Sequence, residues 1–249
     1  AAMAGWASRL VMAAMGLWPI WRRLGGFAPV TARSLIEAAR PLFTISGPAI
    51  LTQLATPVGQ VVVTRMVAGY GEAAVAGMAI AGRLTPVAFG MIFALSGAIG
   101  PIIGQNLGAR RMDRVRRGFR DAILFAGLVI LVMSALLFLG RGAIADLFRA
   151  EGLTRDLVYL FCGPLSLMFF FNALIFVANA ACNNLGAAMQ STLVNWGRHT
   201  LGTVPFALWG AQVAGPQGVL IGQAFGGVVF GLLAVFLALR VIDRRAATL

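Results

Sequence analysis

The chain has 249 residues, of which 59% are hydrophobic and only 11% are charged, and its mean hydropathy is +0.87. A soluble domain of this length carries more charge on its surface, so the composition excludes that class and indicates an integral membrane protein. The formal net charge of +12 does not indicate nucleic-acid binding, because the arginines lie in short loops between apolar runs, as membrane topology requires.

All 20 basic residues are arginine, and glycine occupies 31 positions. We interpret this bias as the coding preference of a GC-rich prokaryotic genome, and so expect a bacterial protein. The two cysteines, Cys162 and Cys182, both lie in apolar segments and form no CxxC or other metal-binding spacing. We therefore expect two free, buried thiols and no metal site.

Apolar segments follow one another along the whole chain. Crossing a hydrocarbon core of about 30 Å takes about 20 helical residues. Residues 1–21 form a partial span, and six full spans follow at approximately 42–68, 73–105, 121–140, 157–182, 190–212 and 217–239. Backbone groups have no water to bond with in lipid, so all spans must be helices. The sequence predicts an all-α integral membrane protein with six full transmembrane helices and a partial N-terminal one.

Arginines are divided unequally between the two sets of connecting loops. One set holds thirteen: four within residues 22–40, six in the 108–121 loop and three after residue 239. The opposite set holds three, in the 141–156 loop, which also carries three acids. Because positively charged loops are retained in the cytoplasm, we expect a multi-pass protein of the plasma membrane with a cytoplasmic C-terminus. Counting back places residue 1 outside without an export signal, so we interpret the chain as a piece of a longer protein.

Glycines recur at spacings of four in two places. Gly100, Gly104 and Gly108 share a helical face at the end of the second span, and Gly218, Gly222 and Gly226 share one in the last span. Small residues on one face let the backbone of a neighbouring helix approach closely. We therefore predict tight helix packing on both faces.

Three spans carry polar side chains at helical spacing, so that each set lies along one face. Amides and hydroxyls that face lipid would be unsatisfied, so these faces must turn toward another helix or a water-filled cavity. Interhelical hydrogen bonding explains any single residue, whereas the stripes together favour a cavity. The candidate cavity residues are Gln53, Thr56 and Gln60 in the first span, Asn172 and Asn179 in the fourth, and Asn195 and His199 in the fifth.

Charged side chains within spans are costly and therefore informative. Arg83, near Pro86, and Arg198 are candidates either for substrate contact or for pairing with backbone carbonyls. For His199, the only histidine, we expect a neutral, hydrogen-bonded imidazole, with a proton relay as the alternative. None of the eight acids lies mid-span, so this chain offers no intramembrane carboxylate for Na+ or a proton.

The chain shows no pattern of catalytic residues. A nucleophile–base pair, an HExxH motif and a carboxylate pair are all missing from the sequence, so we expect no enzyme. The run Phe169-Phe170-Phe171 beside Met168 either lines an aromatic pocket or packs against core and lipid.

A series of short motifs runs through the chain. In order they are Ala73–Ala81 followed by Gly82-Arg83, Ile103–Ala109 (IGQNLGA), Arg114–Arg117, Asn179–Ala181 with Asn183–Gly186, and Gly197-Arg198 with Pro205. In this order they resemble the C-terminal half of a multidrug and toxic compound extrusion (MATE) transporter. The resemblance covers about residues 36–240.

The resemblance implies one lobe of a twelve-helix transporter with two six-helix lobes around a central cavity. Residues 1–21 would be the end of a preceding transmembrane helix and 22–40 a cytoplasmic linker between the lobes. Residues 41–240 would be the six-helix C-terminal lobe and 241–249 a cytoplasmic tail. Membrane lipid would surround this lobe, and the missing N-terminal lobe would be the partner that completes the cavity.

The resemblance also implies secondary active efflux of small amphipathic, often cationic, drugs or toxic compounds by H+ or Na+ antiport. Some members place a coupling carboxylate in the helix that corresponds to 42–68, where this chain offers Gln53 and Gln60. We therefore expect no cofactor here and a coupling-ion site in the missing lobe. The alternatives are a lipid-linked oligosaccharide flippase of the same superfamily and a non-transporting membrane scaffold subunit.

Overall fold

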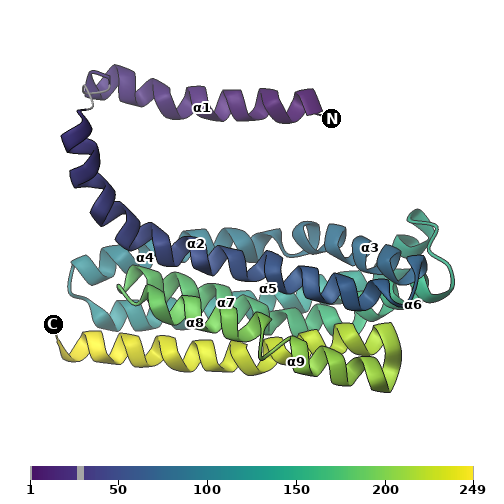
Figure 1. The fold of residues 1–249 in the computed structure, drawn as a ribbon. Helices are drawn as coiled ribbons and strands as arrows, with labels where there is room; N and C mark the ends of the chain where they lie inside the picture. Colours follow the sequence, from purple (N-terminus) through teal and green to yellow (C-terminus); the bar gives the residue numbers. More distant parts are fainter. Residues whose placement is uncertain (1, 27–30, 249) are drawn as a thin grey trace. The chain divides into compact units, whose positions relative to one another are not determined.

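The computed structural model describes residues 2–26 and 31–248, and these residues form helices with no strand among them (Figure 1). This confirms the predicted all-α class. The helices are α1 (Ala2–Leu24), α2 (Ala32–Ala68), α3 (Glu72–Ala88), α4 (Gly90–Gly108), α5 (Met112–Leu147), α6 (Gly152–Leu160), the π-helical turn η1 (Phe161–Leu165), α7 (Ser166–Asn184), α8 (Ala188–His199) and α9 (Val204–Ala247).

The chain divides into two units, Ala1–Ser46 and Gly47–Leu249. The first contains α1 and the start of α2, so residues 32–40, predicted to be linker, are already helical. In the second unit the helices pack side by side as a bundle (Figure 1).

Four helical stretches among the described residues are long and apolar enough to cross a membrane. They are Gly90–Gly108, Met112–Leu147, Gly152–Asn184 and Ala188–Ala247. The last stretch contains a turn at 200–203 and a reversal at Ala214 and Gly215, where Gly215 has φ +56° and Pro216 follows. The reversal lies between the predicted spans 190–212 and 217–239, whereas the turn interrupts the first of them.

Two further breaks divide predicted spans. The 73–105 span breaks at Phe89, three residues after Pro86, while Pro101 lies inside the unbroken α4. The 157–182 span bends at Gly163, which the sequence analysis missed. There the Ser166 hydroxyl donates to the Gly163 carbonyl at 2.7 Å. A side-chain donor thus satisfies a backbone group that the bend releases, as hydrocarbon surroundings require.

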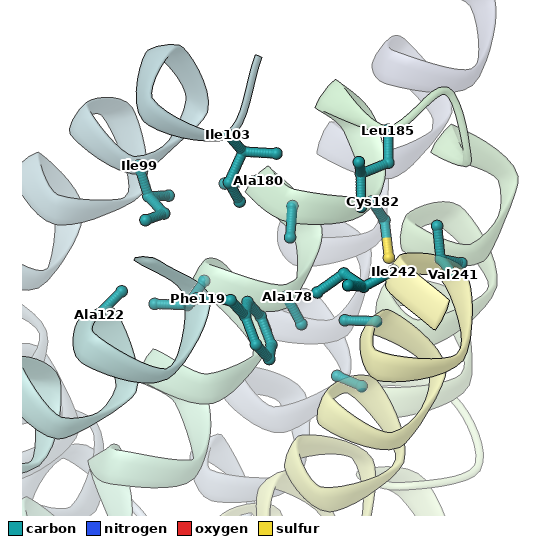
Figure 2. Close-up of a cluster of buried hydrophobic side chains, with 14 of the residues drawn as sticks. Ile99, Ile103, Phe119, Ala122, Ala178, Ala180, Cys182, Leu185, Val241 and Ile242 are labelled. Atoms are coloured by element: carbon teal, nitrogen blue, oxygen red, sulfur yellow. The ribbon is translucent and has the colours of Figure 1, made fainter. Parts of the chain in front are cut away.

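The largest apolar cluster of the bundle joins α4, α5, α7 and α9. Phe119 of α5 is almost fully buried and lies between residues of α7 and α9, near Ala178 and Ile242 (Figure 2). Cys182 belongs to the same cluster, and both cysteines are free and buried, as predicted. Where lipid is as apolar as the core, close packing of this kind is what holds helices together.

The two arms of α9 are in backbone contact along a row of glycines. A Cβ on Gly218 would meet the Gly210 carbonyl, one on Gly222 would meet the Phe206 carbonyl, and one on Gly226 would meet the Gly202 carbonyl. Residue numbers in each pair have the same sum, which is the pairing of two antiparallel helices. The prediction of tight packing on this face is therefore confirmed.

The glycine face of α4 is packed less completely. Gly100 and Gly104 both lie against the Asn184 side chain of α7, whereas Gly108 faces open space. The Asn184 amide donates to the Ala180 carbonyl at 2.8 Å, which fixes its orientation. This part of the glycine face admits a polar side chain instead of a helix backbone.

Replacing Gly222 by alanine is expected to destabilise the bundle. The new Cβ would meet a backbone carbonyl, which no rotamer change can move, so the two arms of α9 would have to separate. We expect a loss of about 1–3 kcal/mol, measured as a lower thermal unfolding temperature in detergent.

Gly82→Ala is the matched control, because Gly82 is exposed within α3 and faces open space. Alanine there should leave stability unchanged or slightly raised, since it is the better helix former. Equal melting of the Gly222→Ala and Gly82→Ala proteins would contradict the hairpin contact.

Candidate functional site

A polar cavity of about 490 Å³ lies between α2, α4, α7 and α8. Among the described residues, its lining contains five amide side chains, three hydroxyls and one aromatic ring, and no charged side chain. The lining residues are Thr52, Gln53, Thr56, Ser96, Gly97, Gly100, Pro101, Phe176, Asn179, Ala180, Asn183, Asn184 and Asn195.

The spacing of residues on α2 determines which side chains reach the cavity. Ala55, Gly59 and Val63 recur every four residues and are buried in the bundle. Gln53 and Thr56 lie on other faces of this helix and remain exposed. Positions i and i+4 share a face of a helix, so Ala55, Gly59 and Val63 form the buried face of α2. Gln53 and Thr56 lie on the remaining surface of the helix, toward the cavity.

Helix α8 is held against α2 by polar contacts beside the cavity. The Thr52 and Thr192 hydroxyls are 2.8 Å apart, and the Trp196 indole N–H donates to the Leu51 carbonyl at 2.9 Å. These bonds satisfy groups that lipid could not, and they fix the cavity wall.

The cavity wall retains unused hydrogen-bonding capacity. Asn195 is 5% exposed and donates through Nδ2 to the Ser191 carbonyl at 2.8 Å. The Oδ1 atom of Asn179 is buried and has no partner among the described residues. A buried acceptor without a donor costs about 1–3 kcal/mol, so a side-chain rearrangement that turned this atom toward a donor in the cavity would recover that free energy. The wall is thus suited to neutral hydrogen-bonding groups beside one aromatic surface.

The structure brings four of the seven predicted cavity residues to this site: Gln53, Thr56, Asn179 and Asn195. Gln60 is exposed one turn further along α2, and Asn172 lies at Gly227 of α9; neither belongs to the lining. Asn183 and Asn184 also line the cavity but are not among those seven. Asn183 continues the face of Asn172 and Asn179 by one helical turn, and both asparagines lie inside a matching motif, which was the signal for Asn184.

His199 does not line the cavity. Its side chain is 3% exposed and packs against Gly59 of α2, where an added Cβ would meet the imidazole ring. Neither ring nitrogen has a hydrogen-bond partner in the part of the chain that the structure describes, so the expected hydrogen bond was wrong. The ring faces Gly59, which lies inside α2. The backbone N–H and C=O groups there are already hydrogen-bonded within the helix, so they offer the imidazole no partner.

The two intramembrane arginines have different surroundings. Arg83 is exposed on α3, whereas Arg198 is half-buried on α8. For Arg198, the structure shows no side-chain hydrogen bond or ion pair to a described residue, and only its backbone carbonyl accepts a bond, from Thr203. Neither arginine belongs to the cavity lining.

The phenylalanine run on α7 packs into the bundle. Phe169 stacks on Phe89 with ring centroids 4.2 Å apart, at the break between α3 and α4. Phe170 lies against Gly127 and Phe171 against Gly231. Of the two interpretations, core packing therefore applies, and the aromatic group in the cavity is Phe176.

The MatE family model matches residues 48–209, which include α3 to α8 and most of α2. The chain belongs to the MatE family. A protein of Pseudomonas savastanoi, described as an uncharacterized 21 kDa protein, is 32% identical over 230 residues, covering 91% of this chain and 75% of that protein. A FAD transporter of Shewanella oneidensis is 27% identical over 253 residues and covers 93% of this chain.

Solved MATE structures have the same fold. The bent form of the Vibrio cholerae MATE transporter VcmN has a TM-score of 0.78 at 24% identity over 90% of this chain, and a MATE protein in the straight conformation has a TM-score of 0.82 at 21% identity over 97%. This chain covers 54% of the FAD transporter and 49% and 56% of those two structures. The predicted membership and the helical transporter fold are thus confirmed, and the chain spans about half the length of these relatives.

Cysteines placed at Gln53 and Asn179 should react with a water-soluble thiol reagent, because both positions line the cavity. The measurement is the mass increase of the protein after labelling in membranes. Val177→Cys is the matched control on the helix of Asn179: Val177 is fully buried, so a thiol there should stay unmodified. Protection of both lining positions would show that the cavity is closed to solvent.

Replacing Gly59 by alanine should displace His199, because the new Cβ would meet the imidazole close to its own backbone attachment. We expect the unfolding temperature to fall, as overpacking typically costs about 1–3 kcal/mol. The double variant Gly59→Ala/His199→Ala removes the collision and should be less destabilised than the sum of the single variants. Additive effects in this double-mutant cycle would show that the two residues are not in contact.

Proposed function

We propose that this chain forms one lobe of a secondary active exporter and that the polar cavity is its part of the substrate pathway. The substrates are small amphipathic organic compounds, moved outward in exchange for H+ or Na+. A second lobe completes the pathway, because alternating access needs two bodies that rock around a shared site.

The observation that carries this proposal is the polar cavity itself, in a protein whose surroundings are lipid. Gln53, Thr56 and Gln60 are exposed along α2, and amides are unfavourable against hydrocarbon. A lobe that covers this face leaves room for a solvated path between the two halves. Cavity volumes of about 300–1,000 Å³ suit drug-sized ligands, and this half alone provides about 490 Å³.

The chemistry of the wall favours recognition through hydrogen bonds. The lining offers amide and hydroxyl groups beside Phe176, which complement a heteroaromatic ring with polar edges. The relative named FAD transporter makes flavins suitable test substrates beside cationic dyes. A cationic substrate would find its counter-charge in the other lobe, because no acid belongs to this lining.

The coupling ion also needs a binding site within the membrane. A coupling Na+ or proton is usually bound by a carboxylate within the membrane, and none of the chain's eight acids is part of the cavity lining among the described residues. We place the coupling site in the other lobe. The excess of arginines at one end of the spans supports a cytoplasmic C-terminus in a protein of the plasma membrane.

The two alternatives explain this cavity less well. A flippase for lipid-linked oligosaccharides needs cations for the diphosphate, yet Arg83 and Arg198 lie outside the lining. A scaffold subunit gains nothing from amide groups around an internal space. A transport experiment with the full-length protein distinguishes both alternatives from an exporter.

In the full-length parent protein, the double variant Gln53→Leu/Asn179→Leu should raise the KM for efflux of its best flavin or dye substrate. Each lost hydrogen bond weakens binding by about 1 kcal/mol, about fivefold, so the expected rise is about 25-fold. The measurement is efflux from loaded cells that lack other exporters, at matched expression.

The control is Gln223→Leu, an amide substitution on α9, which does not contribute to the cavity. It should leave the KM unchanged. Absence of efflux from the parent protein favours a scaffold, and movement of lipid-linked sugar in its place favours a flippase; either result overturns the proposal.

A further inference from the structure

A second large cavity lies on the outside of the bundle, away from the polar cavity. It is a groove of about 650 Å³ where α5 and α9 pack together, at the end of the bundle where the arginines gather. Three arginines, two aspartates and five apolar residues line it. They are Asp113, Arg116, Arg117, Phe119, Arg120, Asp121, Ile123, Leu124, Val235 and Leu239.

The groove is polar at one end and apolar at the other. Asp113 lies in the first turn of α5, and Leu124 lies eleven residues further along, which is about 16 Å of helix. The stretch from Asp113 to Asp121 takes up about 12 Å of this length. The charged part of the groove therefore lies at the level of the lipid headgroups, and the wall of Leu124, Val235 and Leu239 reaches into the hydrocarbon core. Leu124 is 60% exposed, as a residue in contact with lipid would be.

The charges in the groove are balanced. Arg116 forms an ion pair with Asp243 of α9 at 3.5 Å and is thereby neutralised. Of the remaining charges, Arg117 and Arg120 are cationic and Asp113 and Asp121 are anionic, and the structure shows no ion pair for these four among the described residues. Among the described residues, the groove thus contains two arginines and two aspartates without an ion-pair partner, and the charges of these four side chains sum to zero.

We propose that this groove binds phosphatidylethanolamine. The lipid phosphate accepts hydrogen bonds from Arg117 and Arg120, and the ethanolamine ammonium, which lies farther from the apolar wall than the phosphate, donates to Asp113. One acyl chain follows the apolar wall toward the middle of the membrane. Arginine is the side chain best suited to bind a phosphate, and charge-assisted bonds of both signs are the strong ones.

The balance of charge distinguishes this lipid from its competitors. A headgroup with only negative charge, such as phosphatidylglycerol, would be attracted by the arginines and repelled by the two carboxylates. A choline headgroup carries the positive charge but has no N–H to donate to Asp113 or Asp121. A primary ammonium beside a phosphate complements Asp113 together with Arg117 and Arg120.

The test is native mass spectrometry of the full chain with an equimolar mixture of phosphatidylethanolamine, phosphatidylcholine and phosphatidylglycerol that share the same acyl chains. We expect phosphatidylethanolamine to be retained about fivefold more than either competitor. Asp113→Asn/Asp121→Asn should remove this preference and shift retention toward phosphatidylglycerol, because the repulsion is gone. Arg117→Gln/Arg120→Gln should reduce retention of all three lipids.

Matched controls carry the same changes outside the groove. Arg111→Gln/Arg114→Gln alters exposed arginines of the same region, and Glu151→Gln/Asp156→Asn alters acids near the start of α6, none of which line the groove. Both should retain lipid as the unmodified protein does, with equal unfolding temperatures. The proposal is overturned if phosphatidylglycerol is preferred by the unmodified protein, or if the groove variants retain lipids as their controls do.

Discussion

Unpaired polar groups have no water to bond with inside a bilayer, and the arrangement of this lobe follows from that constraint. Many of the amides and hydroxyls of α2, α7 and α8 line one cavity, whereas Gln60 and Asn172 lie outside it. Where a helix must bend, a nearby side chain supplies the missing bond, as Ser166 does at Gly163. The same constraint makes an open, amide-lined surface informative, because lipid leaves the hydrogen-bonding groups of such a surface unsatisfied.

Glycine residues allow helices of this bundle to approach one another closely. The backbone contact between the arms of α9 lets the chain reverse at Gly215 and return along itself. Helix α8 lies against α2, where His199 packs on Gly59 and the Thr52 and Thr192 hydroxyls meet. Close packing at glycine, where no side chain separates the helices, therefore helps to determine which polar faces reach the cavity.

Charge is separated from the cavity in this lobe. The arginines gather at the helix ends, where one forms an ion pair with Asp243 and another, Arg245, donates to the Leu185 carbonyl at the end of α7. A cation at a helix C-terminus stabilises the carbonyls that the helix leaves unpaired. The cavity wall is neutral, so charge-based recognition by this half would have to occur outside it, at the lipid-facing groove.

The sequence alone determined the helical membrane class, the order of most spans, the glycine contacts of α9 and four of the cavity residues, Gln53, Thr56, Asn179 and Asn195. These follow from local rules, since hydrophobic length, small-residue spacing and helical periodicity are all read along one helix. Only the tertiary structure decided that Gln60, Asn172 and His199 lie outside the cavity while Asn183 and Asn184 belong to it. Periodicity assigns a residue to one face of its helix. Which face meets a cavity depends on the bends at Phe89, Gly163 and Gly215 and on the packing of helices that are distant in the sequence. Neither can be predicted from the residues of a single helix.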